Sequence, residues 1–202
     1  FVEENQEFAL VADHLCHQKK GVIVTPVSTS QMVEIVAKKN NCTVIYTPVG
    51  SIYVARTMRM LIEKGSPVIF GGEGNGGLIF PNHQFCRDGG MTAAMMVAIL
   101  TSRGQKLSEL LEQLPKRHMI KDKISAVGGA SILEALKFTY SHTIIDETDG
   151  VKIFQGNSWA LVRASGTEPL IRIIIDADDS EQGTAMHEKL MNAIQKVTRK
   201  KP

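Results

Sequence analysis

The stretch VRASGTEPLIRIII, residues 162–175, places polar side chains between two strand-like apolar runs. Arg163 offers a planar fork of donors that suits two oxygens of a phosphate, and Ser165 and Thr167 add hydroxyl groups. Gly166 lets the backbone reach positive φ, so that successive N–H groups can converge on an anion. Because two residues suffice to join two strands, the additional polar groups predict a phosphate-binding loop.

A structural interpretation of the same segment stays open, because ordinary polar turns use the same residue types. In that interpretation Arg163 pairs with a neighbouring acid such as Glu168. Arg172 follows on the next strand and could approach the phosphate, but we favour an outward-facing ion pair for it.

A second polar segment, VIFGGEGNGGLIFP, surrounds Glu73 and Asn75 with glycines directly after a predicted strand. Ligands of open α/β sheets bind beyond the carboxyl ends of the strands. Glu73 would repel a phosphate, but its carboxylate can accept hydrogen bonds from two neighbouring sugar hydroxyls. We assign Glu73, Asn75 and Gly76 to sugar binding, with a plain flexible loop as the alternative. His83 and Arg87 follow this loop and could approach the sugar, but they rank below Glu73.

Composition excludes several classes of protein. The formal charge of +2, from 23 basic and 21 acidic residues, lacks the one-sided basic surface that nucleic-acid binding needs. The three cysteines show no C-x-x-C pairing, which argues against a zinc site or a disulfide framework and fits the cytoplasm. No apolar run is long enough for a membrane span, and we expect no metal site in these residues. The chain lacks a starting methionine, so we expect a fragment or a processed product.

Apolar periodicity in the first part of the chain alternates between strand and helix. Helices are expected at 7–16, 28–39, 51–65 and from Asp88, which would cap the last of them; strands are expected at 21–24, 42–46, 67–73 and 78–81. Ser28 lies three residues before Gln31, the spacing of a capping box. Strands that alternate with helices predict a largely parallel sheet.

The pattern changes near Leu114-Pro115, which we interpret as a linker. Beyond it we expect a helix at 130–138, strands at 142–146, 151–154, 159–164 and 170–177, and a last helix from about Ser180 whose basic end is frayed. This order predicts an α/β protein with a mixed α/β layered domain at 1–114 and a small α+β domain with an antiparallel sheet at 115–202.

The two polar segments in this order resemble the α-D-phosphohexomutases, the family of phosphoglucomutases, phosphomannomutases and phosphoglucosamine mutases. GGEGNGG is similar to the sugar-binding loop of their third domain, and RASGTEP to the phosphate-binding loop of their fourth. TPVGSIYVARTM and CRDGGMTAA are similar to other segments of the third domain and occur in the expected order. The resemblance covers essentially the whole chain and implies a TATA-binding-protein-like fold for the second domain.

The resemblance also implies a mechanism for the complete enzyme. A serine of the first domain carries the phosphoryl group, a D-G-D-x-R loop of the second binds Mg²⁺, and a hexose 1,6-bisphosphate is the intermediate and activator. These residues would therefore position the hexose phosphate, while the N-terminal domains of the same polypeptide supply the chemistry. We expect neither the phosphoserine nor the metal loop here, and no turnover by this chain alone; a homo-oligomer stays open.

Two departures from the family pattern leave the hexose undecided. Asn75 stands where many relatives have Ser, and Asn occurs in the N-acetylglucosamine branch and in some archaeal-looking enzymes; Pro48 stands where many have Lys. We favour the phosphoglucomutase/phosphomannomutase type, with phosphoglucosamine mutase second. A sugar-phosphate-binding module without chemistry is the rival from another class. A nucleotide-binding domain is disfavoured, because neither G-x-G-x-x-G nor a P-loop is present.

Overall fold

The protein is described by a computed structural model that covers residues 1–125, 129–143, 145–165 and 168–198. Contacts within the chain divide it into two compact units, Phe1–Pro115 and Lys116–Pro202. Among the described residues, no helix is both long enough and apolar enough to span a lipid bilayer.

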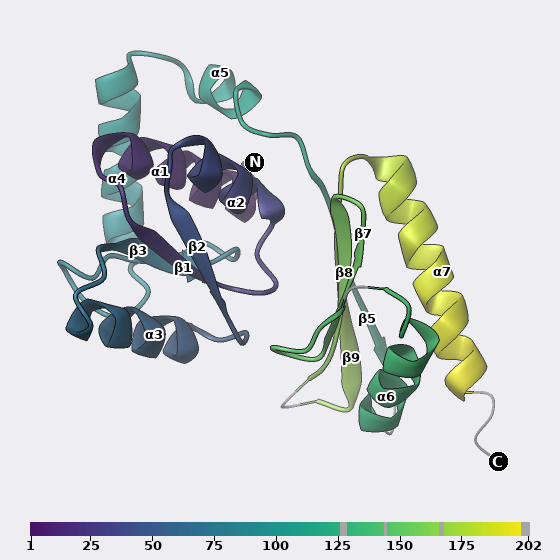
Figure 1. The fold of residues 1–202 in the computed structure, drawn as a ribbon. Helices are drawn as coiled ribbons and strands as arrows, with labels where there is room; N and C mark the ends of the chain where they lie inside the picture. The colour runs from purple at the N-terminus through teal and green to yellow at the C-terminus, as the bar shows by residue number, and fades with distance from the viewer. Residues whose placement is uncertain (126–128, 144, 166–167, 199–202) are drawn as a thin grey trace. The chain divides into compact units, whose positions relative to one another are not determined.

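The first unit is a four-stranded sheet between helices (Figure 1). Its helices are α1 (Glu4–Gln18), α2 (Gln31–Lys39), α3 (Ser51–Glu63), α4 (Gly89–Arg103) and α5 (Leu107–Glu112), and its strands are β1 (Val22–Pro26), β2 (Thr43–Thr47), β3 (Val68–Glu73) and β4 (Gly77–Ile79). The strand order is β2-β1-β3-β4, in which β1 pairs in parallel with β2 and β3, and β4 runs antiparallel to β3. The predicted largely parallel sheet is confirmed.

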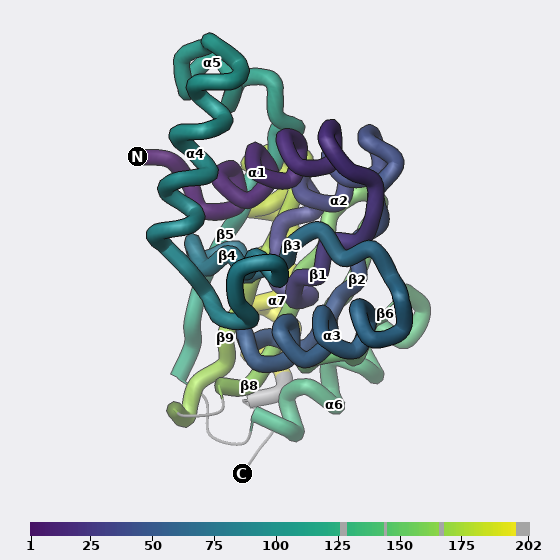
Figure 2. Tube along the Cα trace, turned by 90° about the vertical axis from the view of Figure 1, so that its left-hand side faces the viewer, coloured from purple at the N-terminus to yellow at the C-terminus, as the bar shows by residue number. Residues whose placement is uncertain are grey.

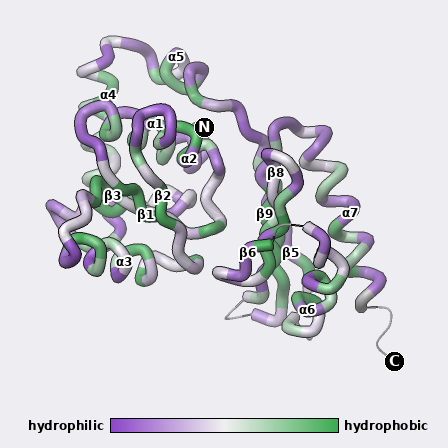
Figure 3. The backbone as a smooth tube through the Cα atoms, in the orientation of Figure 1, coloured by the Kyte–Doolittle hydropathy of each residue, from purple (hydrophilic) through white to green (hydrophobic). Residues whose placement is uncertain are grey.

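Alternating side chains of the strands separate two apolar cores in this unit. Ile23 and Phe70 point into a core with α1, α2, α4 and α5, while Val24 packs with Val54 and Met58 of α3. Figure 2 shows α1 and α2 on one side of the sheet and α3 on the other. Both faces are therefore covered, as expected for parallel strands that read as continuous apolar runs. Figure 3 colours much of β1 hydrophobic for this reason.

One predicted helix start in the first unit is wrong. Helix α2 is capped by Ser30, whose hydroxyl accepts a hydrogen bond from the Met32 N–H at 3.2 Å, and not by Ser28. The capping-box spacing from Ser28 to Gln31 is coincidental here, because three residues within the segment can serve as caps and only the turn geometry selects one.

The second unit packs two helices against one face of a five-stranded antiparallel sheet (Figure 1). Its strands are β5 (His118–Ser125), β6 (Ile145–Asp146), β7 (Val151–Gln155), β8 (Ser158–Ala164) and β9 (Leu170–Ala177), and its helices are α6 (Gly129–Thr139) and α7 (Ser180–Thr198). Leu136 of α6 and Leu190 of α7 meet the inward side chains of the strands, such as Val162 and Ile173. The predicted antiparallel α+β arrangement is confirmed.

Strand β5 was not predicted from the sequence. It forms an edge of the sheet and pairs along its whole length with β9, and its side chains alternate between half-buried and exposed from Ile120 onward. Its HMIKDKIS sequence has few of the residues typical of strands, so its pairing with β9 decides its conformation. Of the basic end KVTRKKP that was expected to fray, residues 196–198 still belong to α7, and residues 199–202 lie outside the described residues.

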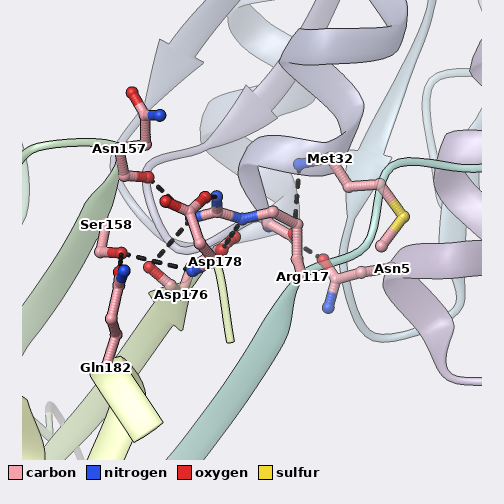
Figure 4. Close-up of polar contacts among 9 residues, drawn as sticks. Asn5, Met32, Arg117, Asn157, Ser158, Asp176, Asp178 and Gln182 are labelled. Carbon is pink, nitrogen blue, oxygen red and sulfur yellow. Dashed lines mark hydrogen bonds and ion pairs between the residues drawn. The ribbon is translucent and has the colours of Figure 1, made fainter. Parts of the chain in front are cut away.

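Arg117, next to β5, is the centre of a polar network in the second unit (Figure 4). Its Nε donates to Asp176 Oδ1 at 2.5 Å, Nη1 contacts Asp178, and Nη2 donates to the carbonyl oxygen of Asn157 at 2.7 Å. The side chains of Arg117 and Asp176 are 2% and 0% exposed. The network therefore links β5, β9 and the β7–β8 turn, and each charge compensates the burial of the other.

Replacing Arg117 should destabilise the second unit strongly. Arg117→Met removes the cation that pairs with the buried Asp176 carboxylate, which should lower the free energy of unfolding by about 3–5 kcal/mol. Urea denaturation followed by circular dichroism measures this change. Arg172→Met is the matched control, because its half-exposed ion pair with Glu168 should contribute no more than about 1 kcal/mol. Equal losses in the two variants would contradict the prediction.

Candidate functional site

The loop between β3 and β4 places Glu73 at the carboxyl end of a strand. Glu73 is the last residue of β3 and pairs across the turn with Gly77, the first residue of β4. Asn75 lies exposed at the tip of this turn, and Gly76 is next to it. The three residues assigned to sugar binding from the sequence thus lie together in one tight turn.

Side chains from β1 and α1 hold both sides of this turn. The Thr25 hydroxyl donates to the Gly72 carbonyl oxygen at 3.0 Å, and it lies 2.6 Å from the Thr29 hydroxyl, which must then be the donor of that pair. Next to Glu73 on the other side, Gly74 packs so closely on Asn5 that a Cβ there would lie 2.2 Å from Asn5 Oδ1. The backbone around Glu73 is therefore fixed by buried contacts.

The Glu73 carboxylate has an unusual environment for a buried charge. Its side chain is 10% exposed, and its nearest recorded partner is Arg87, whose Nη1 lies 3.7 Å from Oε2. This separation is an ion pair, longer than a hydrogen bond. Within the described residues no donor is recorded in hydrogen-bond contact with either carboxylate oxygen. A buried carboxylate normally accepts several hydrogen bonds, so this one is available to a ligand.

The segment that carries His83 and Arg87 is held next to β4. The Asp88 N–H donates to the Leu78 carbonyl oxygen at 2.9 Å, and the Asp88 carboxylate caps α4 by accepting from the Met91 N–H at 2.8 Å. The predicted cap is confirmed. His83 Nε2 lies 3.2 Å from Asp88 Oδ2, so His83 contacts this cap, whereas Arg87 contacts Glu73.

In the second unit, Arg163 lies near the end of β8, where the predicted phosphate-binding loop begins. Its Nε is 3.2 Å from Asp149 Oδ2, but this buried atom makes no hydrogen bond of good geometry. The close approach of Asp149 to Arg163 depends on the next residue, Gly150, because a Cβ there would lie 2.9 Å from the Arg163 Cα atom. Because this Nε is buried, an anion would have to be bound through the other guanidinium nitrogens of Arg163, whose side chain is 19% exposed.

The acid that pairs with Arg163 differs from the one named by the structural interpretation. Asp149 takes this place, while Glu168 lies 3.6 Å from Arg172 in the expected outward ion pair. Asp149 is brought to Arg163 because it directly precedes β7, which pairs with β8. The TDG turn signal before β7, combined with the hairpin register, could have identified it from the sequence.

The rest of the predicted phosphate-binding loop is only partly described. The Ser165 N–H donates to the Leu170 carbonyl oxygen at 2.9 Å and closes the hairpin. Gly166 and Thr167 lie outside the described residues. The sugar-binding and phosphate-binding candidates belong to different units, and their roles stay predictions.

Comparison with known proteins identifies the family. The model of the phosphoglucomutase/phosphomannomutase α/β/α domain III matches residues 3–118, and that of the C-terminal domain of the same family matches residues 102–193. The chain belongs to the phosphoglucomutase/phosphomannomutase family. The resemblance inferred from the two polar segments is thereby confirmed.

Individual relatives agree with this membership of the phosphoglucomutase/phosphomannomutase family. A phosphoglucomutase/phosphomannomutase of Thermococcus kodakarensis is 42% identical over 189 residues, which cover 90% of this chain and 40% of the relative. A phosphoglucosamine/phosphogalactosamine mutase of Sulfurisphaera tokodaii is 36% identical over 180 residues, covering 87% of this chain and 38% of the relative. The chain therefore spans about two fifths of the length of these relatives.

Solved structures show the same fold at low sequence identity. A phosphoglucomutase/phosphomannomutase family protein of Burkholderia thailandensis has a TM-score of 0.76 at 16% identity, covering 96% of this chain and 42% of that one. An Aspergillus fumigatus N-acetylphosphoglucosamine mutase, solved in complex with GlcNAc-6P and magnesium, has a TM-score of 0.66 at 16% identity, covering 96% and 43%. Both support the predicted α/β fold class.

The Asp88 cap should make the stability of the first unit depend on pH. The hydrogen bond from the Met91 N–H, followed by those from Gln84 and the nearby His83, lowers the pKa of the Asp88 carboxyl. A lowered pKa in the folded state adds stability that is fully present above the unfolded value of about 4. That stability is lost as the pH falls through the lower folded value.

Asp88→Asn tests this dependence, because it keeps an acceptor but removes the charge. The difference in unfolding free energy between wild type and Asp88→Asn should be constant near neutral pH and shrink below about pH 4. Urea titrations at a series of pH values measure it. A difference that persists undiminished at the lowest pH would show that the charge of Asp88 is not involved.

Proposed function

We propose that this chain positions the substrate in a phosphohexomutase that interconverts hexose 1-phosphates and hexose 6-phosphates. The enzyme would be of the phosphoglucomutase/phosphomannomutase type and use a phosphoserine and a 1,6-bisphosphate intermediate. The observation that carries the proposal is the Glu73 carboxylate, which is nine-tenths buried without a recorded hydrogen-bond donor among the described residues. Two adjacent hydroxyls of a sugar ring provide the donors that this carboxylate needs.

The phosphate would be bound by Arg163, Ser165, Gly166 and Thr167. The Arg163 side chain is 19% exposed with its Nε turned to Asp149, so its other guanidinium nitrogens would donate to the phosphate, and a phosphate dianion can form several charge-assisted hydrogen bonds at once. Asp149 lowers the net positive charge around Arg163, so the site would bind phosphate reversibly. Such reversibility suits an enzyme whose bisphosphate intermediate must turn over between two transfer steps.

Ring turnover explains why a carboxylate is suited to the sugar side. The 3- and 4-hydroxyls roughly exchange places when the ring turns over, and a carboxylate offers each of them an equivalent oxygen. Binding through these hydroxyls does not involve carbon 2, where glucose and mannose differ. We therefore infer weak discrimination between glucose and mannose phosphates by this part of the protein.

The residues described here do not fit a magnesium site. No group of three or more His, Cys, Asp or Glu side chains in the described residues could hold a metal ion. A phosphohexomutase structure from Aspergillus fumigatus was solved with magnesium, and a variant of that enzyme with glucose 1,6-bisphosphate. We propose that both ligands act with the whole protein, and we assign no step on the metal to these residues.

Phosphoglucosamine mutase is the second candidate. It is favoured by the Sulfurisphaera tokodaii relative, named a phosphoglucosamine/phosphogalactosamine mutase, and by Asn75, whose exposed amide could contact a substituent of the sugar. A binding module without chemistry is the remaining rival. The gene separates them, because an enzyme requires a serine loop and a D-G-D-x-R loop in the same polypeptide or in a partner.

The proposed function is tested with the full-length protein. Mutase activity is measured with the 6-phosphates of glucose, mannose and glucosamine, and we expect turnover of glucose and mannose phosphates. Glu73→Gln keeps the shape but loses the charge, so kcat/KM should fall about ten- to a hundredfold. Arg103→Ala, which removes the cation paired with Asp13 in the same unit, is the control. Activity confined to glucosamine 6-phosphate would favour the second candidate, and no activity would reject both.

The 202-residue chain by itself should bind phosphate weakly and show no turnover. Binding of inorganic phosphate is followed by amide NMR shifts at Ser165 to Thr167, and Arg163→Ala should abolish these shifts. Lys137→Ala is the control, because Lys137 contacts Glu134 and Glu147 on the surface of the same unit. Mutase activity of the isolated chain, or shifts that persist in Arg163→Ala, would contradict the assigned roles.

A further inference from the structure

We propose that Arg87 is a positioning residue for Glu73: it holds the carboxylate in the orientation that receives the sugar and leaves the carboxylate's hydrogen-bonding capacity unused. The inference rests on the proposed function, in which Glu73 binds sugar hydroxyls. Three features of the structure support it: the fixed backbone at Arg87, the path of its side chain across Gly77, and the length of its ion pair with Glu73.

The backbone at Arg87 is fixed from both directions. The residue that follows it, Asp88, donates its N–H to the Leu78 carbonyl oxygen of β4 and begins α4 as its cap. Earlier in the same segment, the N–H groups of His83 and Gln84 both donate to the Phe80 carbonyl oxygen at 2.9 Å. Arg87 therefore starts from a fixed position next to β4.

The aliphatic part of Arg87 occupies the space that a side chain at position 77 would need. A Cβ added to Gly77 would lie 2.2 Å from Arg87 Cδ and 2.9 Å from Arg87 Cγ. Gly77 is the cross-strand partner of Glu73. Arg87 thus crosses the strand pair at the level of the carboxylate, and the absence of a side chain at Gly77 allows it to do so.

The ion pair is suited to orienting Glu73 without saturating it. At 3.7 Å the guanidinium attracts the carboxylate but does not form a hydrogen bond with it. No other ion pair to Glu73 is recorded in the described part of the chain. Because an isolated charge is costly to bury, Arg87 supplies the compensation, while the carboxylate keeps its acceptor sites for hydroxyl groups.

A purely structural ion pair would behave differently from a positioning one. If Arg87 only stabilised the fold, its loss would affect the protein whether or not Glu73 carries a charge. If Arg87 acts through Glu73, its loss should matter little once the carboxylate has been replaced. A double-mutant cycle separates these two cases, because contacting residues that act as a unit are not additive.

The cycle is measured in the full-length enzyme with Arg87→Ala, Glu73→Gln and the double variant. Arg87→Ala should raise KM for the hexose phosphate about tenfold with little change in kcat, because it weakens binding in the ground state and transition state alike. The double variant should be no worse than Glu73→Gln. Added guanidinium ion should restore part of the affinity of Arg87→Ala.

Arg59→Ala is the matched control. The Arg59 guanidinium of α3 lies 4.6 Å from the centre of the Phe85 ring, and Phe85 belongs to the same segment as Arg87. No contact of Arg59 with Glu73 is recorded among the described residues. Its KM should stay close to that of the wild type. Gly77→Ala should reproduce the effect of Arg87→Ala by displacing the arginine. Additive losses in the double variant, or an equal effect of Arg59→Ala, would overturn the inference.

A second measurement distinguishes failure of the positioning role of Arg87 from failure of the proposed function. A full-length wild-type protein that is inactive on every hexose phosphate would reject the proposed function. NMR of the Glu73 side chain then tests Arg87 directly: its rotamer couplings should become averaged in Arg87→Ala and stay unchanged in Arg59→Ala. Couplings that are the same in wild type and Arg87→Ala would reject the positioning role even in an active enzyme.

Discussion

The compensation of one buried carboxylate organises the site in the first unit. Glu73 ends β3 with its side chain only 10% exposed, and burying an uncompensated charge is costly. Its compensation comes from Arg87, which lies beyond β4 in the sequence. Because β4 pairs with β3 and the N–H of the α4 cap residue bonds to β4, Arg87 is brought back to the end of β3. Strand pairing, helix capping and the charge pair therefore depend on one another.

In the second unit a comparable arrangement places a cation at a strand end. Arg163 lies in β8 next to a hairpin that brings Asp149 close, and the sheet behind it is packed against α6 and α7 through a continuous apolar core. The buried Arg117 network connects strands of the same sheet. Rigid packing and buried charges thus keep the backbone of β8 and β9 in place up to the loop that is proposed to bind phosphate.

Much of the fold could be predicted from the sequence because its elements are strongly periodic. In the first unit the strands and the helices α1 to α4 follow from apolar spacing, whereas the short α5 was not predicted. The Asp88 cap follows from a polar residue directly before an apolar helix. Strand β5 could not be predicted, because its mixed charged and apolar residues adopt a strand through pairing with β9. The Ser30 cap depended on turn geometry that residue types alone do not determine.

For the site, residue types predicted which side chains can bind a sugar or a phosphate, but not what surrounds them. The proximity of Asp149 to Arg163 follows from hairpin register, and that of Arg87 to Glu73 from the path of a long loop. Both are tertiary contacts between residues that are separated in the sequence, so residue types and local spacing do not reveal them.

The packing of Arg87 across Gly77 has a consequence for how such sequences can diverge. The two positions share one volume, so a relative that acquires a large side chain at position 77 has to give up the arginine at position 87 or move its loop. After such a replacement, a different group would have to compensate the charge of Glu73. Covariation between these two positions would then mark branches of the family that solve the same electrostatic problem in different ways.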